Sequence, residues 1–114
     1  MTAIPLTNLR GRLDERELIA RVINGDARAQ RELYDNHVDR VYRLAYRLAG
    51  EDELARDFTQ LTFIRAFERI AEFRHDSSLS TWLHAIGVSV ALNGLRTVKK
   101  NRLRNVPLEE ATEG

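Results

Sequence analysis

"EDELARDFTQLTFIRAFERIA", residues 51–71, is the stretch that decides the fold. When its residues are placed at 100° intervals around a helix, most of the apolar side chains gather on one broad face. The acidic residues 51–53 suit a helix start, because carboxylates complement the positive end of the helix dipole. We therefore predict a long helix that ends near Ala71. Its expected core face consists of Ala55, Phe58, Thr62, Ala66 and Ile70, flanked by Phe63 and Phe67.

The same helix carries a second apolar group on its outward side. This stripe, spaced i, i+3, i+4 and i+7, consists of Asp57, Gln60, Leu61 and Ile64. A solvated helix face gains nothing from exposing a leucine and an isoleucine together. Either the N-terminal helix covers the stripe, or the stripe is a docking surface, apolar at its centre and polar at its rim. Periodicity alone leaves both explanations open.

Two helices are predicted before this one. "DERELIARVINGD", residues 14–26, places Leu18, Ile19, Val22 and Ile23 on one stripe. Gly25 suits the left-handed position after a helix, and Asp26 suits the N-cap of the next. The second helix runs from about Ala27 to Ala49 and ends at Gly50. Its apolar positions are Tyr34, Val38, Val41, Ala45 and Leu48, and a basic stripe on the same helix consists of Arg40, Arg43 and Arg47.

A fourth helix follows the polar loop "FRHDSSLS", residues 73–80. Ser78 or Ser80 is its N-cap, and the helix continues to about Lys100. Gly87 and Gly94 lie near its inner face, where a missing side chain permits close helix packing. The predicted inner face consists of Leu79, Trp82, Leu83, Ile86 and Val90, and the outer stripe of Ala85, Ser89, Leu92, Arg96 and Lys99.

The composition agrees with an all-α protein. At 114 residues the chain fits one domain, and 43% hydrophobic with 31% charged residues is typical of a helical globular domain. We expect a compact four-helix bundle over residues 14–100, a flexible N-terminus at 1–13 and a linker at 101–114. No stretch approaches the roughly twenty apolar residues of a membrane span, and the start has no signal-peptide core, so a cytoplasmic location is expected.

Charge at the end of the fourth helix points to nucleic acid. "RTVKKNRLR", residues 96–104, holds five positive charges and no negative one. Complementing the helix dipole needs fewer cations than this, whereas contact with phosphates explains all of them. "NVPLEEATEG", residues 105–114, is acidic and has little to bury, as expected of a linker.

Signs of catalysis or metal binding are missing from the sequence. Cysteine is absent, and His37, His75 and His84 form no i, i+4 pair that could hold a metal. The chain has neither a phosphate-binding glycine loop nor a nucleophile elbow. We expect a protein that works by binding, without a cofactor, and not an enzyme.

Two segments carry a resemblance to a known family. "DFTQLTFIRAF" is similar to D-x-x-Q-E-x-F-x-x-A-[FWY], and "FRHDSSLSTWL" to F-R-x-D-[AS]-x-x-x-T-W-L. Both patterns belong to the second conserved region of bacterial sigma factors of the extracytoplasmic-function class, which the chain resembles over roughly residues 18–100. The order and separation of the two segments also agree with that family.

The resemblance implies a four-helix domain that binds core RNA polymerase and recognises the minus-ten promoter element. It assigns the outward stripe, Asp57, Gln60, Leu61 and Ile64, to the polymerase clamp helices. It assigns the loop to the capture of a flipped base of single-stranded promoter DNA, and the fourth helix to contact with promoter DNA. It also implies an anti-sigma protein as a regulatory partner. The implied DNA-binding residues are Arg74, His75, Asp76, Ser77, Ser78, Ser80, Ser89, Arg96, Lys99 and Lys100. Trp82 is expected to anchor the loop in the core rather than to stack on a base.

The chain departs from the family pattern at three positions and in its extent. Leu61 stands where the family usually has Glu, and Ala85 and Ser89 replace the Arg and Asn of its R-I-A-x-N motif. The family's second helical domain does not follow, as in a fragment or in a short protein that acts without it. Three hypotheses result: a promoter-recognition factor, a regulatory module that binds polymerase or an anti-sigma protein without DNA readout, and a generic basic DNA-binding bundle.

Overall fold

The computed structural model describes the backbone of residues 6–105 and the side chains of residues 14–104. Within this range the chain forms four α-helices and one short 3₁₀ helix, and no strand. The order is α1 (Leu6–Ile23), α2 (Ala27–Ala49), α3 (Asp52–Arg69), η1 (Ile70–Glu72) and α4 (Leu79–Asn105). The predicted all-α bundle is therefore confirmed.

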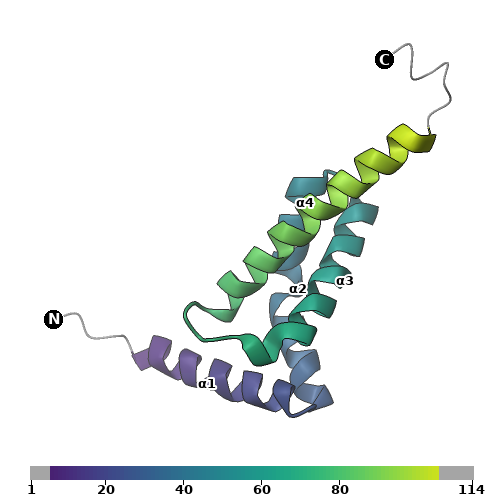
Figure 1. Ribbon diagram of the computed structural model, residues 1–114. Helices are drawn as coiled ribbons and strands as arrows, with labels where there is room; N and C mark the ends of the chain where they lie inside the picture. The colour runs from purple at the N-terminus through teal and green to yellow at the C-terminus, as the bar shows by residue number, and fades with distance from the viewer. Residues whose placement is uncertain (1–5, 106–114) are drawn as a thin grey trace.

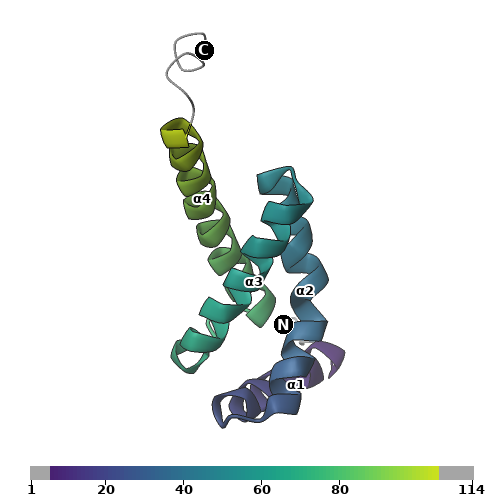
Figure 2. The ribbon, with the colours of Figure 1, turned by 90° about the vertical axis from the view of Figure 1, so that its right-hand side faces the viewer.

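Helices α2, α3 and α4 pack against one another, and α1 lies across one end of them (Figure 1). Most contacts of α1 are with α2 and η1. Helix α4 extends beyond the ends of its neighbours, as a second view also shows (Figure 2). The bundle therefore presents long lateral faces of α3 and α4 that α1 does not cover.

The turns between α1, α2 and α3 contain the glycines and the capping residue that the sequence predicts. Gly25 and Gly50 have φ values of 85° and 73°, in the left-handed region that glycine adopts without strain. Asp26 caps α2, because its Oδ1 accepts hydrogen bonds from the backbone N–H groups of Arg28 at 2.9 Å and Ala29 at 3.2 Å. These bonds, together with that from Arg21, lower the pKa of Asp26 below its ordinary value. Sequence and structure agree closely here because capping is a local interaction.

The predicted core faces are largely correct. Along α3, Ala55, Thr62 and Ala66 are fully buried, and the Thr62 hydroxyl donates to the Phe58 carbonyl at 2.6 Å. Leu79, Leu83 and Val90 of α4 are also buried. The main cluster of the core joins α1, α2, α3, η1, Phe73 of the loop and α4.

Gly87 and Gly94 permit the close approach that was predicted. A β-carbon at Gly87 would lie 3.2 Å from Leu44 Cδ2, on α2. At Gly94 it would lie only 2.3 Å from Phe58 Cε1, on α3. The ring of Phe58 therefore occupies the space that a side chain at residue 94 would need, and this contact sets how closely α4 lies against α3.

Several predictions of bounds and burial were wrong. Ile23 and Leu48 were expected inside but are 49% and 37% exposed, because each lies on the side of its last turn that no neighbouring element covers, whereas Val22 beside Ile23 is buried. Helix α1 begins at Leu6 rather than at residue 14, and α4 ends at Asn105 rather than near Lys100. No proline lies between residues 6 and 105 to stop either helix earlier. Residues 1–5 of the predicted flexible N-terminus and residues 106–114 of the predicted linker lie outside the described residues.

Candidate functional site

The outward stripe of α3 is open to solvent. All four of its residues are exposed, with 37% of Leu61 and 48% of Ile64 accessible. The other large apolar side chains of α3 are buried or half-buried. Helix α1 packs on α2 and η1 instead of on this stripe, so the explanation that the N-terminal helix covers it is wrong. The stripe is an apolar patch with Asp57 and Gln60 at its margin.

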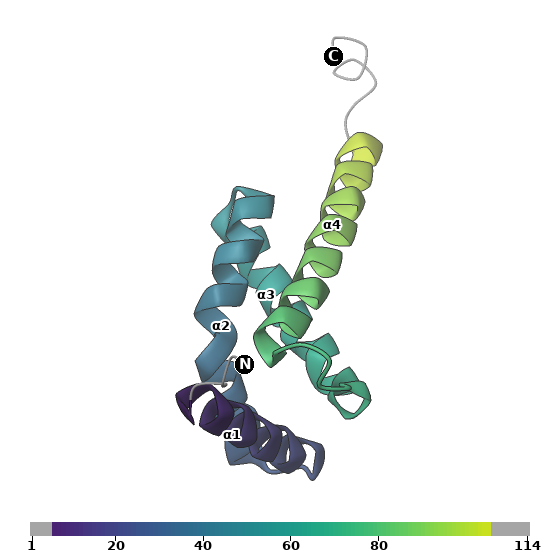
Figure 3. The same cartoon turned by 90° about the vertical axis from the view of Figure 1, so that its left-hand side faces the viewer.

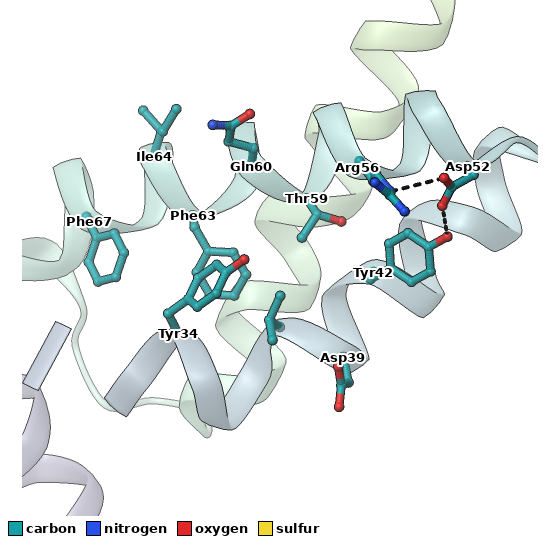
Figure 4. A pocket seen from close by; sticks show the side chains of 11 residues that line it. Tyr34, Asp39, Tyr42, Asp52, Arg56, Thr59, Gln60, Phe63, Ile64 and Phe67 are labelled. Carbon is teal, nitrogen blue, oxygen red and sulfur yellow. Dashed lines mark hydrogen bonds and ion pairs between the residues drawn. The ribbon is translucent and has the colours of Figure 1, made fainter. Parts of the chain in front are cut away.

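A groove between α2 and α3 adjoins the stripe (Figure 4). Its volume is about 720 Å³, and aromatic rings form one end, where Tyr34 meets Phe63 edge-on at a centroid distance of 4.8 Å. In Figure 4, Gln60 and Ile64 point away from α2 at the rim of the groove. Sequence reasoning missed this groove, because it lies between two helices whose relative position only the fold sets.

The other end of the groove is polar. The hydroxyl of Tyr42 donates to Asp52, and Arg56 Nε lies 3.0 Å from the second oxygen of that carboxylate (Figure 4). The hydrogen bond raises the pKa of Tyr42 and lowers the pKa of Asp52. Asp52 therefore joins α2 to the first turn of α3 beside the outward stripe.

The loop between η1 and α4 is anchored by aromatic packing. Phe73 is buried and lies 5.2 Å from the ring of Trp82 and 4.6 Å from that of His75, measured between centroids. Trp82 is half-buried against the main core, in agreement with its predicted role as an anchor. His75 has a φ of 61°, which turns the chain sharply after Phe73. Arg74, Asp76, Ser77 and Ser78 remain exposed beyond this anchor.

Serines hold the end of the loop where α4 begins. Ser78 is the N-cap, since its Oγ accepts a hydrogen bond from the Thr81 backbone N–H at 3.1 Å, while Ser80 lies within the first turn. Arg40 of α2 donates to the Ser80 hydroxyl and so ties α2 to this turn. Sequence reasoning placed Arg40 in a basic stripe but had no signal for its partner, which lies 40 residues away in sequence.

The predicted DNA-binding residues fall into two groups. Arg74 to Ser80 gather at the start of α4, whereas Arg96, Lys99 and Lys100 are exposed near its other end. Ser78 and Arg96 are separated by about 27 Å along the helix at 1.5 Å per residue. Ser89 lies between them on the exposed outer stripe, together with Ala85. A single small ligand cannot reach both groups, whereas an extended strand can.

Histidines and carboxylates form no centre for metal chemistry in the described part of the chain. Residues 14–104 contain no group of three or more metal-ligating side chains. His37 and His84, distant in sequence, line the same small crevice between α2 and α4, beside Arg40. Burial lowers the pKa of His37 below its ordinary value, because it disfavours the charged imidazole. Among the described helices, none has an apolar stretch of the length a membrane span requires.

Comparison with known proteins now defines the class. Residues 33–101 match the family described as sigma-70 region 2, and the match covers more than half of the chain. The chain therefore belongs to the sigma-70 region 2 family. The predicted resemblance to sigma factors of the extracytoplasmic-function (ECF) class is confirmed by the relatives described next.

Its relatives are RNA polymerase sigma factors. ECF RNA polymerase sigma factor SigE of Mycolicibacterium smegmatis is 41% identical over 76 residues, which are 67% of this chain and 29% of that protein. ECF RNA polymerase sigma factor SigW of Bacillus subtilis is 35% identical over 81 residues, 71% of this chain and 43% of the relative. RNA polymerase sigma-H factor of Pseudomonas aeruginosa is 33% identical over 81 residues, which are 71% of this chain and 42% of that protein. The chain thus spans less than half the length of these relatives.

Proposed function

We propose that this chain is the part of a bacterial transcription initiation factor that binds core RNA polymerase and recognises and melts the minus-ten promoter element. It acts by binding and not by catalysis, in the cytoplasm. The α3 stripe docks on the clamp helices of the polymerase, and the loop at 74–80 captures a flipped base of the non-template strand. The observation that carries the proposal is the exposed pair Leu61 and Ile64, on a helix that buries its other large apolar side chains in whole or in part.

Docking on this stripe is favourable because it removes apolar surface from water. Covering what remains exposed of Leu61 and Ile64 contributes on the order of 1 kcal/mol each. Gln60 and Asp57 at the margin supply hydrogen bonds that orient the partner. Leu61 adds apolar surface where the family usually has a carboxylate, so the centre of this interface is less polar in this chain.

Capture of a base requires a pocket with free hydrogen-bonding groups, because extrusion costs a few kcal/mol in lost stacking and pairing. The exposed side chains of Arg74, Asp76 and Ser77 are available for this task. Ser77 donates to the Ser78 carbonyl at 3.2 Å, a long bond that a base edge can replace. Phe73 and Trp82 hold the backbone beneath these groups.

The polymerase contact is tested by a double variant, Gln60→Ala with Ile64→Arg, in a binding assay with core polymerase. We expect at least tenfold weaker binding with an unchanged melting temperature, because neither side chain packs in the core. Arg69→Ala, exposed on α3 outside the stripe, is the matched control. Wild-type affinity in the double variant would remove the stripe from the interface.

The DNA contact is tested with the polymerase complex and templates that carry each base at the captured position. We expect a preference for a bubble or a single non-template strand over duplex, and Ser77→Ala is expected to change the base preference. Binding to polymerase without any promoter contact would instead favour a regulatory module that binds polymerase or an anti-sigma protein. Equal binding to every sequence and form would favour a generic basic DNA-binding bundle.

A further inference from the structure

Helix α2 carries a row of cations that the proposed function does not use. Arg40, Arg43 and Arg47 recur at i, i+3 and i+7, so they lie on one side of α2, and all three are exposed. Between residues 40 and 50 the chain has no carboxylate. Cations on an ordinary solvated helix face are usually interspersed with anions, as they are at the start of α2, where Arg31 pairs with Asp35 at 3.1 Å.

The row lies beside α4. Arg40 donates to Ser80 in the first turn of α4, and one turn further along α2, Leu44 contacts the backbone at Gly87. At the end of α2, Ala49 lines a groove with Leu95 and Val98 of α4. Contacts that advance together along both helices mean that α2 and α4 run in the same direction, as Figure 3 shows. The arginine row therefore accompanies the first half of α4, where α4 itself has no lysine or arginine.

No ion pair among the described side chains involves this row. The ion pairs among residues 14–104 involve Arg21, Arg31, Arg56 and Arg102, and none involves the three arginines of the row. Helix α4 contains no Asp or Glu from Leu79 to Asn105. The α2 row thus lies beside a helix without acidic residues, with Ser80 of the loop at one end of the row. Unpaired cations in a row attract a polyanion along its length.

We infer that Arg40, Arg43 and Arg47 form a phosphate-binding edge that holds the backbone of the promoter strand beside α4. This inference rests on the proposed function and extends it to a helix outside the two sequence motifs. The row spans about 10 Å of helix, the rise of roughly three nucleotides at 3.4 Å each. The edge supplies positive charge beside the half of α4 that has no lysine or arginine of its own. Phosphate contacts position a strand without reading its sequence, so the loop remains the element that selects the base.

The test is the salt dependence of binding to a short labelled single strand of the minus-ten region, measured by fluorescence anisotropy with the whole chain. The variant is Arg43→Gln with Arg47→Gln, since glutamine keeps the length of the side chain and removes the charge. Arg40 is left in place because it also holds Ser80. Arg28→Gln with Arg31→Gln is the matched control, on the same helix and with the same change in net charge.

Each lost phosphate contact lowers the slope of log affinity against log salt by about 0.7–0.9. For two contacts, the loss of affinity between about 50 and 200 mM salt becomes roughly tenfold smaller in the variant than in the wild type. The control pair is expected to keep the wild-type slope. Polymerase binding and base preference are expected to stay unchanged, because neither Arg43 nor Arg47 belongs to the α3 stripe or contacts Ser80 through a hydrogen bond.

A wild-type slope in the Arg43→Gln, Arg47→Gln variant would overturn the inference while leaving the proposed function intact. Weaker polymerase binding in that variant would also overturn it, because the row would then be a protein contact. A wild-type chain that binds no single strand at low salt, alone or with polymerase, would remove both the inference and the proposed DNA contact.

Discussion

The α3 stripe and the loop after η1 are both exposed, but they are built in opposite ways. The stripe consists of side chains on the outer face of a helix whose inner face is locked by buried residues such as Ala55, Thr62 and Ala66. The loop is held at its two ends, by Phe73 against Trp82 and by Ser78 and Ser80 on α4, while the side chains between them contact little of the core. The first region is therefore backed by buried residues along its length, and the second only at its two ends.

This difference fits the two partners that we propose. A rigid protein surface is bound with least loss of entropy by side chains that are already in place. An extruded base must be surrounded, which requires a segment that can adjust while its ends stay fixed. If the two regions differ in this way, apolar groups in the loop serve stability and those in the stripe do not.

The largest effect is expected at the anchor of the loop. Phe73→Ala is predicted to lower the free energy of unfolding by about 3 kcal/mol or more, because it leaves a cavity beside Trp82. Ile64→Ala, an apolar truncation on the stripe, is expected to change it by less than about 0.5 kcal/mol. Urea denaturation followed by circular dichroism measures both. Equal losses would show that the two regions do not divide stability and binding in this way.

A smaller effect is expected where α4 meets α3. Gly94→Ala is predicted to destabilise the fold by about 1–3 kcal/mol, because its β-carbon would overlap the ring of Phe58. Gly87→Ala is the control within the same helix. There the β-carbon would meet the movable end of Leu44, and alanine gains up to about 1 kcal/mol in helix propensity, so a near-neutral result is expected. Thermal melting of the two variants decides whether Phe58 sets the packing of α4.

The hydrogen bond between Arg40 of α2 and Ser80 at the start of α4 is expected to contribute less to stability. A double-mutant cycle of Arg40→Ala and Ser80→Ala is predicted to give a coupling free energy of about 0.5–1 kcal/mol, as for a solvent-exposed hydrogen bond to a charged group. Hydrogen exchange of the first turn of α4 provides a second measurement, and faster exchange is expected in both single variants. Additive effects of the two substitutions would mean that Arg40 does not hold the loop end.

The smallest effect concerns His37, in the crevice between α2 and α4. Burial lowers its pKa below the ordinary value of 6.5, so the unfolded chain binds the proton more readily than the folded chain. Stability is therefore expected to fall as the pH drops below about 6.5, and His37→Gln should reduce this fall. The measurement is unfolding by urea between pH 7.5 and pH 5. An identical pH dependence in the variant would assign the fall to groups other than His37.

The helices and their caps could be predicted from the sequence because they depend on local interactions. Periodicity sorted α3 into its buried face and its outer stripe correctly, and Gly25, Asp26 and Gly50 marked the turns. The predictions failed at helix ends, as at Ile23 and Leu48, where burial depends on whether another element reaches that turn. Periodicity singled out the stripe, and the family resemblance assigned its partner and the loop residues; these roles stay predictions until binding is measured.

The sequence by itself determined which residues form helices, which faces are apolar and which family the chain resembles, because these follow from neighbours a few positions apart. Only the tertiary structure decided that α1 leaves the α3 stripe open, that Arg40 reaches Ser80, and that an acid-free edge of α2 runs along α4. The physical reason is that these features depend on the direction and spacing of packed helices. Contacts such as that of Phe58 at Gly94, between residues 36 positions apart, set that geometry.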